Sequence, residues 1–96
     1  MQHQPAAGYN IKMKAGDLIK LRQTPDGRYL DKFLYIYKDA RGPSWESIGK
    51  WFPGDIGLVV DPKVDNEGML FVLIKEKLGW VDVGYIQNVD GEYLVD

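Results

Sequence analysis

The sequence contains no cysteine, and its single histidine, His3, stands near the amino-terminal end. Without cysteine there is no disulfide framework, no thiolate nucleophile and no cysteine-ligated zinc site. Acid–base and nucleophilic catalysis need a positioned proton acceptor with a pKa near neutrality. The serines Ser44 and Ser47 have no recognisable base to activate them. We therefore expect no enzyme, no small-molecule substrate and no cofactor.

A metal site is not expected either. The acidic stretch that contains Asp61, Asp65, Asn66 and Glu67 offers oxygen ligands. Its spacing does not match the D-x-[DN]-x-[DN]-G pattern of a calcium loop, which places ligands at alternate positions before a sharp glycine turn. The stretch is interpreted as a hydrated connection between two strands.

Long hydrophobic runs are also missing. The longest apolar run, from Met69 to Ile74, is far shorter than the about 20 residues that cross a bilayer as a helix. The N-terminal segment MQHQPAAGYN has neither a basic start nor a hydrophobic core, so no signal peptide is expected. These features predict a protein that is cytoplasmic when synthesised and has no membrane partner.

Charge of one sign is not in large excess, since the net charge is −2. It is unevenly spread along the chain. Residues 1–52 carry nine Lys and Arg against five Asp and Glu, a net +4, and residues 53–96 carry three against nine, a net −6. Either the two signs intermix when the chain folds, or they leave two opposite faces through which copies associate head to tail.

The chain has the length of one domain, at 96 residues. Residues 1–13 are polar and aperiodic and are interpreted as an N-terminal arm, while residues 14–96 form the folded domain. Alternating apolar residues and β-branched or aromatic content predict five to seven short antiparallel strands. The expected strands are 17–22, 28–38, 55–60, 69–75, 80–83, 85–89 and 93–95. Without a long helical pattern, the fold class is an all-β barrel or sandwich.

Some of these strands carry more specific expectations. In 28–38, Leu34 and Ile36 lie on one face and the aromatic residues on the other. The strand 69–75 is apolar on both faces, which predicts a central position in the sheet. Turns are expected at 24–27, where Thr-Pro-Asp-Gly has the residues of a tight turn, and at 77–79, which contains Gly79.

The stretch 39–54, DARGPSWESIGKWFPG, is the most irregular part of the chain. Glycine–proline pairs stand near both of its ends, so it is predicted to be a long insertion loop. Ser44 has the chemistry to cap a single helical turn over residues 45–48, which Gly49 would end. Loops of this kind often carry function.

Several segments resemble the SH3-like barrels, in particular their KOW and Tudor-like branch. They are KAGDLIKL at 14–21, GDIGLVV at 54–60, FVLI at 71–74 and GWV at 79–81, followed closely by Tyr85 and Ile86. The same segments are similar to small uncharacterised SH3-like proteins of tailed bacteriophages. The resemblance covers about residues 14–95, apart from an insertion at 23–53. It implies a small SH3-like barrel, and it bears on the fold more than on the function.

Aromatic residues are numerous, with three tryptophans, three phenylalanines and six tyrosines. Trp80, Phe71 and Phe33 are expected to fill the core. Aromatic residues in or beside the insertion loop either plug one end of the barrel or form an exposed contact surface, where such rings contribute most of the binding energy. The candidate interaction residues are Trp45, Trp51, Phe52, Tyr35, Tyr37 and Arg41.

The leading functional hypothesis is a non-catalytic module that binds another protein or copies of itself. The resemblance of the chain to phage proteins extends this hypothesis to a structural part of a virion, such as a decoration, connector or neck component. The alternative is a KOW-like factor that binds nucleic acid, because lysines and arginines are interleaved with Tyr29, Tyr35 and Tyr37. The net negative charge disfavours this alternative, since contacts with phosphate dominate such binding.

Overall fold

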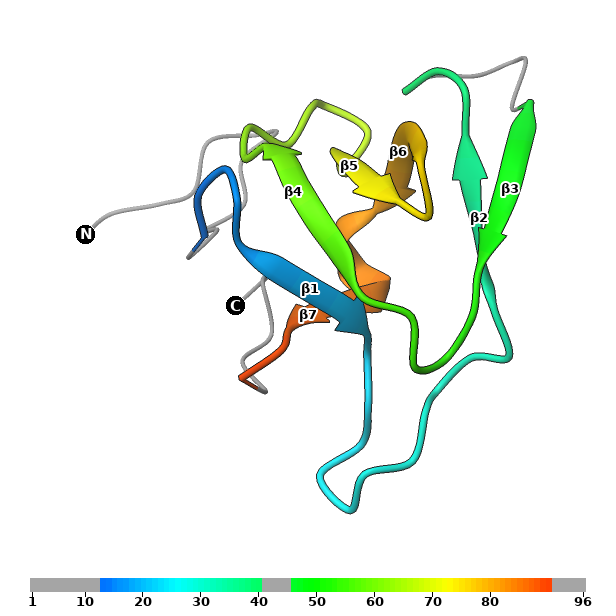
Figure 1. Ribbon diagram of the computed structural model, residues 1–96, viewed down its shortest axis with the longest axis vertical. Coiled ribbons are helices and arrows are strands. Elements are labelled where there is room, and N and C mark those ends of the chain that lie inside the picture. Colours follow the sequence, from blue (N-terminus) through cyan, green and yellow to red (C-terminus); the bar gives the residue numbers. More distant parts are fainter. Residues whose placement is uncertain (1–12, 41–45, 91–96) are drawn as a thin grey trace.

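Seven short strands form a single sheet in the computed structural model, which describes residues 13–40 and 46–90 (Figure 1). All pairings are antiparallel, and the order across the sheet is β3-β2-β6-β5-β4-β1-β7. No α-helix occurs within these two ranges, so the all-β class is confirmed. The strands are β1 (Leu18–Leu21), β2 (Leu34–Tyr37), β3 (Ser47–Trp51), β4 (Gly57–Asp61), β5 (Met69–Ile74), β6 (Lys77–Asp82) and β7 (Ile86–Asn88).

The sheet is open, so the all-β class is shown without the closure of a barrel. Its two edges are β3 and β7, at opposite ends of the strand order. The hairpin of β2 and β3 lengthens the sheet beyond β6, because β2 pairs with β6 at Tyr37 and Trp80. Figure 1 shows this hairpin on one side of the molecule and β1, β4 and β7 on the other. The bent sheet encloses the core between these two sides.

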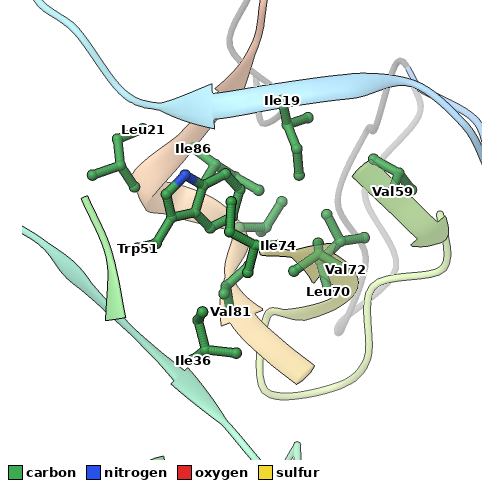
Figure 2. Packing of buried hydrophobic residues seen from close by; sticks show 11 residues of the cluster. Ile19, Leu21, Ile36, Trp51, Val59, Leu70, Val72, Ile74, Val81 and Ile86 are labelled. Carbon is green, nitrogen blue, oxygen red and sulfur yellow. The ribbon is translucent and has the colours of Figure 1, made fainter. Parts of the chain in front are cut away.

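The core is built from the alternate residues of the strands that face inward. Ile19 and Leu21 of β1 are buried, as their period-two pattern predicted. In β2, Ile36 is buried while Tyr35 is exposed, so the predicted separation of the two faces is confirmed for this pair. Trp51 lies at the centre of the cluster, with its indole among aliphatic side chains (Figure 2). The buried cluster consists of Ile19, Leu21, Ile36, Trp51, Val59, Leu70, Val72, Ile74, Val81, Val83 and Ile86.

Strand β5 holds the central position that its apolar sequence predicted. It lies between β4 and β6, with three strands on each side of it in the sheet order. Leu70, Val72 and Ile74 point into the core, and the alternate residues Phe71 and Leu73 are half-buried on the outer face. The outer face of the sheet is therefore apolar here as well.

The prediction of an irregular loop with a helical turn at 39–54 is wrong for residues 47–51. Residues 47–51 form β3, which pairs with β2 so that Leu34 faces Trp51 and Tyr35 faces Lys50. Pairing with a neighbouring strand satisfies the backbone groups that a single isolated helical turn leaves unpaired. Gly49 does not end a helix: a Cβ at this position would lie 2.8 Å from Cδ of Lys77.

The turn expected at 77–79 is also misplaced. The chain reverses at Lys75 and Glu76, both with positive φ, and Lys77 already belongs to β6. Gly79 lies inside β6, where a Cβ would come within 2.9 Å of the carbonyl oxygen of Tyr37. Both misread glycines thus mark places where the β2–β3 hairpin approaches β6 closely, and neither marks a chain reversal.

Strand β7 begins later than predicted, because residues 83–85 form a 3₁₀ turn, η1 (Val83–Tyr85). The Asp82 side chain caps this turn by accepting a hydrogen bond from the Gly84 backbone N–H at 2.9 Å. Of the predicted N-terminal arm, only Met13 is described, and it packs against the core. The rest of the arm and the last predicted strand, 93–95, lie outside the described residues.

Candidate functional site

Four aromatic side chains form a continuous row along the outer side of the β2–β3 hairpin, which we call the aromatic ribbon: Phe52, Phe33, Tyr35 and Tyr37. The ring centroids of Phe33 and Tyr35 are 5.1 Å apart, and the rings meet edge to face at 80°. Phe33 and Phe52 follow at 6.2 Å, and Tyr35 and Tyr37 at 6.1 Å. Each ring therefore touches the next within the range of favourable aromatic contacts.

The local sequence explains this row. Residues two apart in a strand share a face, so Tyr35 and Tyr37 lie on the side of β2 opposite to Ile36, and Phe33 immediately precedes the strand. The register that places Leu34 opposite Trp51 brings Phe52, the next residue, alongside Phe33. Because successive side chains point to opposite faces of the hairpin, Trp51 lies in the core and Phe52 lies on the outer side.

The ribbon is open to solvent and accompanied by lysines. Tyr35 is 41% exposed and Phe52 45% exposed. The ammonium nitrogen of Lys50 lies 4.6 Å from the ring centroid of Phe33 and 5.9 Å from that of Tyr35. Lys75 lies 5.9 Å from the Phe52 ring and makes an ion pair with Asp55 at 2.9 Å. These cations are attracted by the negative faces of the rings, so they cover part of those faces.

Half of the candidate residues taken from the sequence come together in this ribbon, namely Tyr35, Tyr37 and Phe52. Trp51 is not part of the ribbon, because its side chain is fully buried and its Nε1–H donates to the Asp55 carbonyl oxygen at 2.9 Å. The prediction that Trp51 contributes to an exposed surface is therefore corrected. Trp45 and Arg41 lie outside the described residues.

Phe33 was expected to fill the core, but it lies in the ribbon. Phe71 and Trp80, also predicted to fill the core, are likewise half-buried on the outer face, with ring centroids 5.0 Å apart. Trp80 pairs directly with Tyr37 on β2, and Phe71 pairs with Trp80. The rings of Trp80 and Phe71 therefore continue the row of aromatic residues from β2 across β6 to β5. The apolar sequence of β5 on both faces could have indicated that some of these rings lie outside, because only one face of a strand can point into a core of this size.

A concave pocket of about 330 Å³ opens where the ribbon ends at Tyr37. Among the described residues, two tyrosines and two carboxylates contribute to its walls, and no lysine or arginine does. Asp82 is held at the end of β6 by its cap hydrogen bond, and Glu67 comes from the connection between β4 and β5. The pocket is lined by Leu34, Tyr37, Glu67, Met69, Asp82 and Tyr85.

Known proteins give no guide to this site. A scan against protein-family models, a search of curated proteins and a search of solved structures each find no significant match. Across residues 13–40 and 46–90, no group of three or more acidic, histidine or cysteine side chains is placed to hold a metal ion. In the same ranges no helix is long and apolar enough to cross a membrane. The geometry of the ribbon is therefore the basis for assigning a function.

Proposed function

We propose that this chain is a non-catalytic binding module that holds another protein, or a second copy of itself, against the aromatic ribbon. The observation that carries the proposal is the row of four contacting rings on an open face, with Tyr35 and Phe52 each more than two-fifths exposed. Single exposed apolar residues are ordinary on protein surfaces, whereas a continuous apolar patch marks an interaction site. Tyrosine is among the residues that contribute most energy at protein interfaces.

The narrower fold assignment, an SH3-like barrel, is part of the proposal. It is supported by the antiparallel meander of β4, β5 and β6, followed by η1 and by the return of β7 to pair with β1. In this interpretation the β2–β3 hairpin is an elaboration of the long connection between β1 and β4. A binding surface on this hairpin agrees with the general tendency of connections to carry function on a rigid scaffold.

Protein is favoured over nucleic acid as the partner by the orientation of the rings. Nucleobases stack on ring faces that are free and accessible. Here Phe33 and Tyr35 meet edge to face, and the Lys50 ammonium group covers the face of Phe33. The ribbon thus presents an uneven apolar ridge, which is suited to packing against side chains of a partner.

The test compares the Tyr35→Ser and Phe52→Ser double variant with Leu18→Ser. Leu18 is 47% exposed on β1, four strands away from β2 in the sheet order, so Leu18→Ser removes an exposed apolar side chain elsewhere on the surface. Sedimentation of the purified chain measures self-association, and affinity capture from the native source measures a heterologous partner. We expect the double variant to lose association while its circular-dichroism spectrum is unchanged, and Leu18→Ser to keep both.

Equal association of the two variants would contradict a contact through the ribbon. Unfolding of the double variant would show that these rings support the core, contrary to their exposure. Single variants then separate the two rings, since a serine at position 52 removes the contact with Phe33 and a serine at position 35 removes the contacts with Phe33 and Tyr37. Each contact is worth about 1 kcal/mol.

Nucleic-acid binding is kept as a second candidate because Lys50 stands beside two rings of the ribbon. It predicts that single-stranded DNA or RNA binds the purified chain and that binding weakens steeply as salt rises. Fluorescence anisotropy with labelled oligonucleotides measures this, with Lys50→Gln as the variant that should weaken binding. No anisotropy change at low salt would eliminate this candidate.

The proposal that the partner belongs to a bacteriophage particle derives from the sequence resemblance. It predicts that the gene for this chain stands among genes for head, neck or tail proteins, and that the chain copurifies with assembled particles. A gene neighbourhood made of translation factors would instead favour the nucleic-acid candidate.

A further inference from the structure

We infer that the pocket at the Tyr37 end of the ribbon binds an arginine side chain presented by the partner. This inference rests on the proposed function, since it names the chemistry of the segment that the ribbon would dock. Its starting observation is the composition of the pocket: two tyrosine rings, two carboxylates and the apolar floor residues Leu34 and Met69, in a volume of about 330 Å³.

The two carboxylates are not neutralised within the described protein. Four ion pairs join described residues, and neither Glu67 nor Asp82 takes part in any of them. The Arg22 guanidinium donates to the Gly84 carbonyl oxygen at 2.6 Å, beside the pocket, whereas Lys50 and Lys75 lie over Phe33 and Phe52 at the other end of the ribbon. The pocket thus contains two carboxylates that form no ion pair with any described residue.

The backbone holds both acids in place. Asp82 lines the pocket and accepts the Gly84 N–H through Oδ1, which leaves Oδ2 as a further hydrogen-bond acceptor. Glu67 belongs to a turn fixed by Asp65, whose Oδ1 accepts the backbone N–H groups of Glu67 and Met69 at 2.9 Å each. Because Met69 pairs with Asp82 across β5 and β6, this turn and the end of β6 are held side by side.

Such a pocket suits a cation that also has an apolar stem. A cation lies favourably over an aromatic ring, and carboxylates accept its N–H groups. Arginine is preferred to lysine because its planar guanidinium stacks on a ring and offers donors in several directions at once, while its methylene stem packs on apolar residues. Tyr85, which is 45% exposed, supplies an accessible ring, and Met69 and Leu34 supply apolar contacts.

The experiment is an NMR titration of the full ¹⁵N-labelled chain with the blocked peptide acetyl-Gly-Arg-Gly-amide. The same peptide with lysine, and with citrulline as a neutral analogue of arginine, serves as comparison. We expect amide shifts centred on residues 67–69 and 82–85 with the arginine peptide, smaller shifts with lysine and none with citrulline. The Glu67→Gln and Asp82→Asn double variant should bind about tenfold more weakly, since hydrogen bonds to charged groups are lost.

Two controls make the result specific. Asparagine retains the side-chain oxygen that caps η1, so Asp82→Asn removes charge without removing the cap. Glu76→Gln removes one acid at the opposite end of β5, and we expect it to bind the arginine peptide as the unmodified chain does. Because the double variant removes two charges and this control one, each single pocket variant is titrated beside Glu76→Gln.

Equal shifts with arginine and citrulline, shifts spread over the whole surface, or unchanged binding by the double variant would each overturn the inference. The outcome is distinguishable from a failure of the proposed function. The peptide reports on the pocket directly, whereas the Tyr35→Ser and Phe52→Ser variant reports on capture of a protein partner. If the partner is lost in that variant but the arginine peptide does not bind, the ribbon stands and only the arginine pocket is refuted.

Discussion

Replacing Trp51 by alanine tests the placement of the two neighbouring aromatic residues on opposite faces of the hairpin. Trp51 is fully buried, and removing a buried tryptophan costs about 3–5 kcal/mol. The variant also loses the hydrogen bond to the Asp55 carbonyl oxygen, which adds about 0.5–1.5 kcal/mol. A domain of this length has a free energy of unfolding of roughly 5–14 kcal/mol. We therefore expect Trp51→Ala to lose about a quarter or more of the stability.

Phe52→Ala provides the matched control one residue away. Phe52 is 45% exposed and contacts Phe33, so its removal should cost about 1 kcal/mol or less. Urea unfolding followed by far-ultraviolet circular dichroism measures both variants, since this signal does not depend on the tryptophan that is removed. If the two variants lose equal stability, or if Trp51→Ala loses less than Phe52→Ala, the assignment of Trp51 to the core and of Phe52 to the ribbon is refuted.

Three further predictions concern turns and close approaches. Gly79→Ala should lower the free energy of unfolding by about 1–3 kcal/mol, because its Cβ would push against the Tyr37 carbonyl oxygen; an unchanged urea midpoint would contradict the approach of β2 to β6. Glu76→Gly should raise the free energy of unfolding by about 1 kcal/mol, because Glu76 has a φ of 67° that glycine adopts without strain. The Thr24 hydroxyl donates to the Asp26 carboxylate and lowers the pKa of Asp26, so Thr24→Val should raise that pKa in an NMR titration. In the unmodified chain, this lowered pKa stabilises the folded state at pH values above the ordinary pKa of aspartate. The contribution is lost as the pH falls through the lowered pKa of Asp26. An unchanged Asp26 pKa in Thr24→Val would contradict the hydrogen bond.

The strands that could be predicted from sequence are those in which one face is clearly apolar. In β1, Ile19 and Leu21 alternate with charged residues, and both are buried as predicted. Strand β5 was placed correctly because only a central strand tolerates apolar residues on both faces. These expectations succeed because burial of apolar area decides them locally.

The parts that could not be predicted depend on contacts distant in sequence. Gly49 and Gly79 have the sequence appearance of turn residues, but their role is to let the hairpin approach β6, and no local pattern reveals that crossing. Likewise, nothing in the dipeptide Trp51-Phe52 shows which ring is buried. The choice is made by the register of β3 on β2, in which Trp51 faces Leu34. A shift of one residue would exchange the two rings.

The candidate site was partly predictable for the same reason. Tyr35 and Tyr37 were identified from alternation within one strand, and Phe52 from its position beside the insertion. The pocket could not be identified, because Glu67 comes from the connection between β4 and β5 and Asp82 from the end of β6, and they meet Tyr37 only through the order of β2, β6 and β5. Acids in a turn and at the end of a strand are individually unremarkable in sequence.

The central claim is that the aromatic ribbon contacts a protein. Placing the photo-crosslinking residue benzoylphenylalanine at position 35, with position 18 as the control, tests it most directly in the native source. The account predicts a defined covalent adduct between the chain and a protein at position 35, and none above background at position 18. An adduct with nucleic acid, or equal labelling at the two positions, would contradict it.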